Sequence, residues 1–402
     1  MAVVALSGAA SAQDDPNSSG SADSPVAIDA GDLWHKIRGR DSTGGDETVG
    51  AHRRYLVFAP SIGSKPSTGL NGGFSGNAAF FSGDPDSTHI SSLSGGFKVT
   101  QKMQSMLGVK VAVFTDNDRW FIQGEDRVSW TSQNTYSLGG SAPASSAENL
   151  KFDFFRLYEN VYRNIKPGLF IGVGLNFNTH SNVRANGSDP AAFDRSAYVA
   201  YNAKHGFSTD GQTSSGTSVG LRYDTRDNGI NAQRGWLASA TCRTFFSGVL
   251  GGDSTWQEVN LDVRTYKNLT KDARQKIAFW FLGDLVTGGT APYFDLPSAG
   301  SDGRSARGYS EGRYRGEHLL YGEVEYRGTI TSNGLVGFVA FANVTTVGSV
   351  ESGDRLFGTY APAAGAGLRV LLNKRSRTNL CTDYAWGRGG SRGFYLSIQE
   401  AF

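Results

Sequence analysis

Apolar and polar residues alternate with a period of two along most of the chain from about residue 55 onwards. In the stretch 258–265, three apolar residues alternate with polar and charged ones, namely Val259, Leu261 and Val263 with Glu258, Asn260, Asp262 and Arg264. The stretches 169–178 and 364–372 alternate in the same way, with glycines on the second face. This pattern predicts β-strands with one unbroken apolar face and one wet face, which suits a lipid-facing wall around a polar lumen. Soluble β-sandwiches also alternate, so the period alone leaves both architectures open.

About sixteen segments of this kind follow one another, each ended by polar or Gly/Asp/Asn turn residues. They lie near 55–61, 68–81, 88–101, 104–115, 118–130, 151–165, 167–179, 215–226, 234–247, 254–268, 274–287, 316–329, 333–346, 360–373, 377–387 and 393–402. An even number returns both ends of a barrel to the same side of the membrane. We therefore predict an all-β fold, a transmembrane antiparallel β-barrel.

The connections between these segments fall into a short class and a long class. Residues 164–168 and 329–334 predict tight periplasmic turns, whereas 131–150, 180–214 and 288–315 predict long outer loops. The second of these loops is rich in Asn, Asp, Ser, Gly and Ala, which predicts an exposed and mobile segment.

Composition agrees with a barrel and excludes several other classes. The 402 residues carry 39 Lys and Arg against 37 Asp and Glu, a net charge of +2 that gives no reason to expect a nucleic-acid partner. Gly is frequent, with 53 residues, and 12% of the residues are aromatic while 39% are hydrophobic. Many twisted strands with one polar face have this composition. Two cysteines, Cys242 and Cys381, cannot build a disulfide framework or a cysteine metal cage.

The first fifty residues differ in character from the rest of the chain. Residues 2–10 are apolar and Ala10-Ser11-Ala12 matches a cleavage site, so residues 1–12 are interpreted as a residual signal peptide. Residues 13–50 are rich in Asp, Ser and Gly and predict a flexible periplasmic segment, either solvated or touching the barrel. The barrel is then expected over residues 51–402. No apolar run is long enough for a membrane-spanning helix, so a crossing must use a closed barrel.

A motif in the middle of the chain, residues 220–228, reads GLRYDTRDN and is followed by Gly235-Trp236. It resembles a segment of the BamA/TamA-type outer-membrane barrel superfamily, the bacterial surface antigen barrels, with Ala232 in place of the family's usual Pro. By alternation Arg222, Asp224 and Arg226 share the inward face and are expected to pair in the lumen. Asp227 then begins the turn that ends the strand.

A second motif, in residues 300–327, resembles the family's loop that folds into the barrel from outside. The resemblance implies a loop tip formed by Arg307, Gly308 and Tyr309, whose arginine packs against acidic residues of the inner wall. Glu325 matches one such partner. The family's second partner is an Asp, where this chain has Asn343, which can still accept a hydrogen bond from the guanidinium; Asp383, inward by alternation, is expected to compensate for the lost charge.

The two ends of the predicted barrel also match the family. Residues 65–69 resemble its opening segment. At the C-terminus, apolar residues are expected on one face, broken once by Glu400, and resemble the signal read by the barrel-insertion machinery: Phe394, Leu396, Ile398 and Phe402.

Nothing in the sequence argues for an enzyme, a metal or a cofactor. Residues 308–312 match the G-x-S-x-G pattern of α/β-hydrolases, but a strand is predicted after Ser310 where that chemistry needs a helix. The six histidines lack ligand spacing.

The resemblance implies a protein integral to the bacterial outer membrane, in contact with its lipid, that inserts or translocates a protein or lipid substrate. Too few residues precede the barrel for a POTRA module, so we expect a barrel-only member that uses a separate periplasmic partner and a lateral seam between the first and last strands. Pro60 at the end of the first strand would weaken pairing there. A passive pore, or a surface-antigen barrel without an assembly role, remains the alternative.

Overall fold

A computed structural model describes residues 28–29, 32, 54–65, 69–187, 189 and 191–402. The expected signal peptide, 1–12, and most of the expected N-terminal segment, 13–50, lie outside the described residues. Within the described ranges, no helix combines the length and the hydropathy needed to cross a bilayer.

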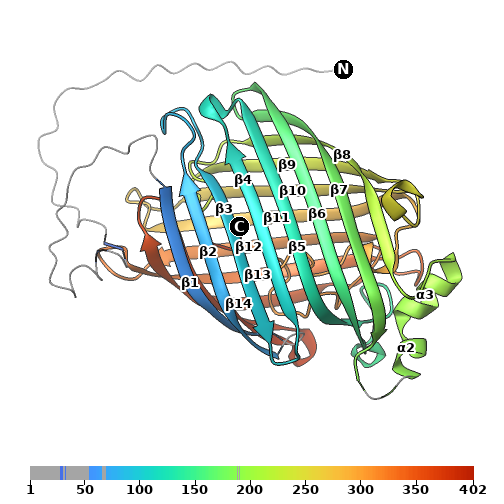
Figure 1. The fold of residues 1–402 in the computed structure, drawn as a ribbon. Helices are drawn as coiled ribbons and strands as arrows, with labels where there is room; N and C mark the ends of the chain where they lie inside the picture. The colour runs from blue at the N-terminus through green and yellow to red at the C-terminus, as the bar shows by residue number, and fades with distance from the viewer. Residues whose placement is uncertain (1–27, 30–31, 33–53, 66–68, 188, 190) are drawn as a thin grey trace, which may run out of the picture.

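Sixteen antiparallel strands, counted over the described residues, form one sheet that closes into a barrel (Figure 1). Each strand pairs with its neighbours in sequence, and β1 also meets β16. The strands are β1 Arg54–Lys65, β2 Gly69–Phe80, β3 Ser91–Thr100, β4 Ser105–Phe114, β5 Trp120–Thr135, β6 Glu148–Lys166, β7 Leu169–Ala185, β8 Gln212–Asp224, β9 Gly235–Phe245, β10 Trp256–Asn268, β11 Gln275–Gly289, β12 His318–Thr329, β13 Val336–Gly348, β14 Ala361–Asn373, β15 Thr378–Gly387 and β16 Arg392–Ile398. The fold predicted from the period of two is therefore confirmed.

The predicted short and long connections lie at opposite ends of the barrel. We call the end with the tight connections, such as Lys166–Leu169 between β6 and β7, the turn end, and the opposite end the loop end. Strands β5, β6 and β7 run further toward the loop end than predicted, because their pairing continues to Thr135 and Glu148. There the inner face becomes apolar, with Phe152 and Phe154 buried against Phe294 and Val183 in the same core cluster. Because the inner face is apolar here, the expectation of a polar inner face did not predict these ends of the strands.

The loop between β7 and β8 contains helices that its composition did not predict, although many of its residues are exposed. It contains α2, Ala191–Arg195, and α3, Ala197–His205, which form part of the loop end (Figure 1). Ser196 caps α3 by accepting a hydrogen bond from Val199 N, and Tyr198 is fully buried, stacked on Phe294 with ring centroids 4.9 Å apart. Because these contacts come from a distant loop, local composition could not predict them.

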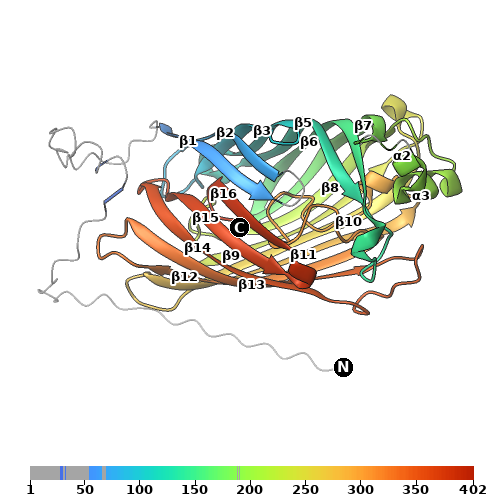
Figure 2. The same cartoon turned by 90° about the horizontal axis from the view of Figure 1, so that it is seen from below.

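The junction between β1 and β16 is the least paired part of the barrel. All twelve residues of β1 are in register with β2, whereas among the described residues a single register pair, Ser64 opposite Phe394, joins β1 to β16. Figure 2 shows the two strands side by side at this junction. Strand β1 continues to Lys65, so Pro60 lies inside the strand and not at its end as predicted.

Two carboxylates, on β5 and β6, lie on the outward face among apolar neighbours. Asp126 faces outward because its neighbours Glu125 and Arg127 form an ion pair inside, and it lies opposite Val109 and Leu157 in the register. Glu159 lies opposite Gly124 and Leu175 on the same outward face. These two carboxyl groups therefore share an otherwise hydrocarbon-like surface.

We expect the Glu159→Leu variant to be more stable than the wild-type protein in phosphatidylcholine vesicles. A charged group on a lipid-facing wall is unfavourable, so its removal should raise the free energy of unfolding by on the order of 1 kcal/mol. Denaturant titration in vesicles measures the change. The matched control is Glu258→Leu, which removes an inward glutamate paired with Arg243 at 2.5 Å and should lower stability. A Glu159→Leu protein less stable than wild type would contradict the lipid-facing assignment.

Candidate functional site

The loop between β11 and β12, residues 290–317, folds back into the barrel and carries the candidate site. Its tip residue Arg307 is only 3% exposed, so its charge is almost fully removed from solvent. An isolated buried guanidinium is strongly unfavourable unless anions and hydrogen bonds compensate it.

Three carboxylates from two strands of the wall surround the Arg307 guanidinium. Nη1 lies 2.7 Å from Asp383 Oδ2 on β15, and Nη2 lies 2.5 Å from Glu323 Oε1 on β12. Nη2 also forms an ion pair with Glu325, two residues further along β12. The guanidinium lies 3.6 Å from the centroid of the Phe341 ring, which adds a cation–π contact. We call Arg307, Glu323, Glu325 and Asp383 the tip cluster.

Two further arginines of the wall extend the tip cluster toward the turn end. Arg327 pairs with Glu325 at 2.5 Å, and Arg369 pairs with Asp383 at 2.6 Å. Arg369 also lies 2.7 Å from Glu400, which follows β16. The cluster thereby connects the loop to β12, β14, β15 and the C-terminal residues through charge-assisted hydrogen bonds.

The backbone of the tip fits closely against the last strands. Gly308 has φ = 108°, and a Cβ added there would approach Ala363 Cβ to 2.9 Å, so glycine is required both for its conformation and for space. Gly308 N donates to the Tyr395 hydroxyl at 2.9 Å. The Tyr309 hydroxyl donates to the Pro362 carbonyl at 2.6 Å and accepts from Arg388 N at 2.9 Å. The tip thus touches the β15–β16 turn beside the weakly paired junction.

The structure brings Arg307 together with two of its expected partners, Glu325 and Asp383. The third, Asn343, has a different role, because its Nδ2 donates to the Arg307 carbonyl oxygen at 3.2 Å and its side chain does not accept from the guanidinium. The sequence analysis missed Glu323 as a partner, although its period-two spacing from Glu325 places both on the inward face. The functional importance of these residues stays a prediction.

The predicted trio on β8 does form an ion cluster, separate from the tip cluster. Asp224 accepts from Arg222 Nη2 at 2.7 Å and from Arg226 Nη2 at 2.8 Å, with all three side chains buried. Asp227 does not join them; it pairs with Arg377 at 2.6 Å across the turn end.

Of the four C-terminal apolar residues expected on one outward face, Phe402 leaves that face. Phe394 is exposed on the outward face of β16, and Leu396 and Ile398 are half-buried. Strand β16 ends at Ile398, and Gln399, with φ = 79°, redirects the chain so that Phe402 is buried against Trp280 with ring centroids 5.2 Å apart. The Phe402 carbonyl accepts from Arg327 Nη2 at 2.9 Å. Recognition of these residues during insertion stays a prediction.

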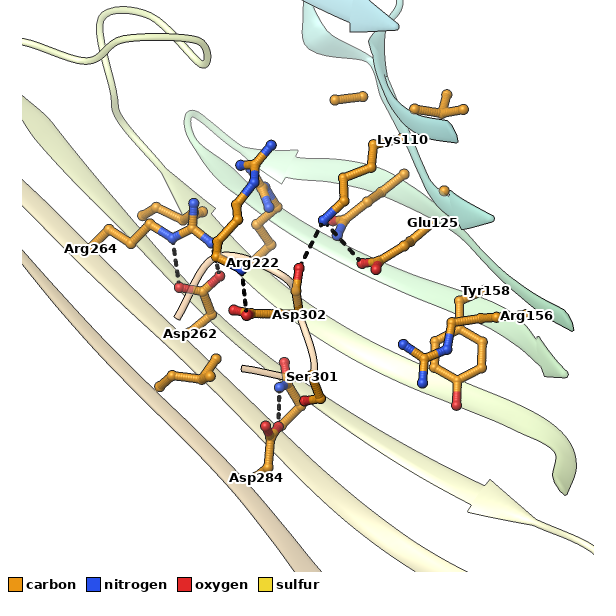
Figure 3. Close-up of a pocket in the computed structure, with 18 of the residues that line it drawn as sticks. Lys110, Glu125, Arg156, Tyr158, Arg222, Asp262, Arg264, Asp284, Ser301 and Asp302 are labelled. Carbon is orange, nitrogen blue, oxygen red and sulfur yellow. Dashed lines mark hydrogen bonds and ion pairs between the residues drawn. The ribbon is translucent and has the colours of Figure 1, made fainter. Parts of the chain in front are cut away.

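On the other side of the loop lies a charged chamber of about 340 Å³ between the loop and the wall (Figure 3). Lys110 reaches from β4 to the Asp302 carbonyl at 3.5 Å, and the Asp284 side chain accepts from Asn260. Burial raises the pKa of Asp295, a loop residue on the chamber wall, to about 6, although Ser214 donates to it at 2.6 Å. The loop is therefore held from both sides of the lumen.

The described residues contain no group of three or more His, Cys, Asp or Glu side chains arranged to hold a metal ion. Ser310, from the hydrolase-like pattern, lies in this loop and is followed by strand β12. The helix on which a nucleophile elbow depends is missing from this place in the described fold.

Comparison with known proteins finds one family model and several solved structures that are similar to this barrel. The model described as the Omp85 superfamily domain matches residues 112–402. BamA from Haemophilus ducreyi lacking POTRA domains 1-3 is similar in structure, with a TM-score of 0.53 and 15% identity over 87% of this chain and 69% of that one. CdiB from Acinetobacter baumannii gives a TM-score of 0.54 and 12% identity over 86% of this chain and 60% of its own. CdiB from Escherichia coli gives a TM-score of 0.54 and 10% identity over 86% of this chain and 63% of its own.

At these identities the solved structures show a common fold. The chain spans less than two thirds of the length of either CdiB chain. No curated protein matches the sequence.

We expect Arg307→Ala to destabilise the barrel by roughly 3–5 kcal/mol, because it leaves buried carboxylates without their cation. Denaturant titration of the refolded protein measures the loss, and protease sensitivity of residues 290–317 reports whether the loop has left the lumen. The matched control is Arg304→Ala in the same loop, since no hydrogen bond or ion pair of the Arg304 side chain is found among the described residues. Equal effects of the two substitutions would contradict the assigned role of the tip cluster.

Proposed function

This chain belongs to the Omp85 superfamily, and on that premise we propose that it is an integral outer-membrane barrel that assists insertion or translocation of a protein or lipid substrate. In this arrangement the turn end faces the periplasm and the loop end faces outward. A separate periplasmic protein delivers the substrate. The single observation that carries the proposal is the junction of β1 and β16, which one register pair joins among the described residues.

A weakly paired junction is suited to the proposed activity for a physical reason. Unpaired backbone N–H and C=O groups inside a bilayer are strongly unfavourable, so the edge of β1 gains free energy by pairing with another strand. Pro60 has no N–H group and lies within β1, which lowers the number of hydrogen bonds that this strand can form. The junction is therefore a lateral gate at which an incoming strand can pair with β1 or a lipid can enter.

The loop supports the same proposal because it folds into the lumen and is held there. Its tip cluster and the chamber contacts hold it from opposite walls, which opposes free diffusion through the barrel. A protein that works at its lateral junction has no need of an open central channel.

The alternative is a passive pore, favoured by the charged chamber of about 340 Å³ beside the loop. Water and small ions would have to pass between the loop and the wall. A surface-antigen barrel without transport activity would need neither the weakly paired junction nor the chamber.

A disulfide across the junction should abolish the assisted insertion of other proteins. Directly opposed residues of antiparallel strands have Cα atoms at about 4.5–5.5 Å, within the range for a disulfide. In a background with Cys242 and Cys381 replaced by alanine, Ser64→Cys with Phe394→Cys would lock the gate. The measurement is the rate at which an unfolded eight-stranded outer-membrane barrel protein inserts into vesicles containing the locked variant, followed by heat-modifiable electrophoretic mobility.

The control lock joins β2 to β3 through Ala78→Cys with Leu93→Cys, a pair away from the junction. We expect the gate lock to reduce the insertion rate to that of empty vesicles and a reductant to restore it, while the control lock has no effect. Full activity of the locked gate would refute the proposed mechanism.

Planar-bilayer conductance distinguishes the proposal from the pore. We expect low conductance for the wild-type protein and a raised or flickering conductance for Arg307→Ala, because the loop loses its anchor. Arg355→Ala, an exposed arginine of the β13–β14 loop, serves as control and should leave the trace unchanged. A large, steady conductance that is the same in the wild-type protein and in Arg307→Ala would support the passive pore.

A further inference from the structure

A hollow of about 580 Å³ lies on the outward face of the barrel wall, over strands β9 to β13. We call it the wall groove. The outward side chains that line it are apolar apart from one threonine, and three of its aromatic rings are exposed, those of Trp236, Phe279 and Phe281. Its volume lies within the roughly 300–1,000 Å³ of typical small-molecule sites. The wall groove is therefore large enough to hold part of a small apolar ligand.

A glycine forms the floor of the wall groove. Gly322 on β12 lies opposite Phe281 on β11 and Val344 on β13, so two large side chains flank a position that has none. A Cβ added at Gly322 would have only Val344 Cγ1 within reach, at 4.0 Å, so the space above the glycine is open. The three residues thus form a slot in the wall that a hydrocarbon chain can enter.

The wall groove runs obliquely from the turn end toward the middle of the wall. One row of residues in register crosses it from β9 to β13, namely Trp236, Thr265, Phe279, Val324 and Ala342. Trp236 is the second residue of its strand from the turn end, whereas Ala342 is the seventh of its own. Tryptophan is enriched where barrel walls meet the headgroup region, so the groove leads from that interface into the hydrocarbon region.

Two basic residues lie at the turn-end mouth of the wall groove. Lys267 follows Thr265 by two positions on β10 and therefore shares its outward face, and Arg234 precedes Trp236 by two positions in the chain. Continuing the register of Thr265 with Trp236 by these two positions places Lys267 beside Arg234. Both residues are exposed.

The protein does not neutralise these two cations. In the described part of the chain, neither side chain forms a hydrogen bond or an ion pair. The carboxylates of the two adjoining turns belong to Asp227 and Asp272, which pair instead with Arg377 at 2.6 Å and with Arg274 at 3.3 Å. An anion at the mouth of the groove would therefore be stabilised by two unmet positive charges.

We propose that the wall groove binds a phospholipid of the periplasmic leaflet. One acyl chain lies along Phe279 and over Gly322, and the phosphate lies between Arg234 and Lys267 at the interface. An anionic headgroup is preferred to a zwitterionic one, because the latter carries its own cation beside the phosphate. The inference rests on the membrane placement that the proposed function includes, and it goes beyond the insertion activity.

The cations and the slot have different parts in this binding. Lipid tails are as apolar as the wall, so contact with hydrocarbon alone distinguishes one lipid from another only weakly. Close packing over Gly322 holds one acyl chain in a defined place. The two cations at the mouth then select for negative charge, and their attraction to the headgroup weakens as salt rises.

Lipid retention in native mass spectrometry tests the site. The wild-type protein, folded in a neutral detergent, is titrated with phosphatidylglycerol and, separately, with phosphatidylcholine that has the same acyl chains. We expect one tightly bound phosphatidylglycerol per barrel and weaker binding of phosphatidylcholine. Arg234→Gln with Lys267→Gln should weaken the phosphatidylglycerol affinity roughly 20-fold, because both charges near the phosphate are lost. Glycerol phosphate, which lacks acyl chains, should not displace the lipid at an equal concentration.

Matched variants separate this site from general effects of charge and shape. Gly322→Leu should fill the slot and reduce phosphatidylglycerol binding, whereas Gly72→Leu on the outward face of β2, where an added Cβ meets nothing within 4 Å, should not. Arg163→Gln with Lys166→Gln removes two exposed basic residues at the turn end of β6 and should leave binding unchanged. Heat-modifiable electrophoretic mobility verifies that each variant is folded.

Three outcomes would overturn the lipid site. They are an equal phosphatidylglycerol affinity of the wild-type and Arg234→Gln/Lys267→Gln proteins, an equal loss in Arg163→Gln/Lys166→Gln, and a dimer that Gly322→Leu dissociates. The dimer would assign the wall groove to a second copy of this chain. The insertion assay with the β1–β16 lock is run in phosphatidylcholine vesicles without anionic lipid, so failure of the lipid site and failure of the proposed function are distinguishable.

Discussion

The arrangement of the lumen depends on the burial of one positive charge, that of Arg307. A guanidinium removed from water requires nearby anions, and three carboxylates from β12 and β15 provide them. Those carboxylates repel one another without the cation, so the loop and the wall stabilise each other. The same requirement explains why Gly308 must be glycine, since the backbone has to approach the wall closely for the guanidinium to reach its partners.

The period of two made most of the barrel predictable from sequence. Alternation fixes which side chains face inward without any knowledge of the partner strand, and it placed Glu325, Asp383 and the Arg222–Asp224–Arg226 trio correctly in the lumen. Alternation did not predict the strand ends at Phe152 and Phe154, because the inner face is apolar there and a polar interior was expected. Helix α3, which buries Tyr198, was missed for a related reason: Phe294, the partner of Tyr198, lies in a distant loop.

The details of the tip cluster were beyond local reasoning because they depend on register between strands. Asn343 lies opposite Glu323 in the register, which places the Asn343 amide beside the Arg307 carbonyl. The Arg307 guanidinium therefore contacts only the carboxylates among these partners. The inward turn of Phe402 depends on one residue, Gln399, at φ = 79°. The alternation of apolar and polar residues cannot predict such a bend. Once the chain turns, Glu400 no longer breaks an outward face and becomes a partner of Arg369.

These contacts make the two sides of the β1–β16 junction unequal. The β16 side is held from inside the barrel, because the tip touches Tyr395 and the β15–β16 turn, and Glu400 continues the ionic network. Strand β1 is held by β2 alone over nearly all its length. If the junction opens, β1 and β2 should therefore move while β16 stays with the loop. In the function proposed above, an incoming strand or lipid would meet the edge of β1, while the charge of Arg307 holds the opposite edge, β16.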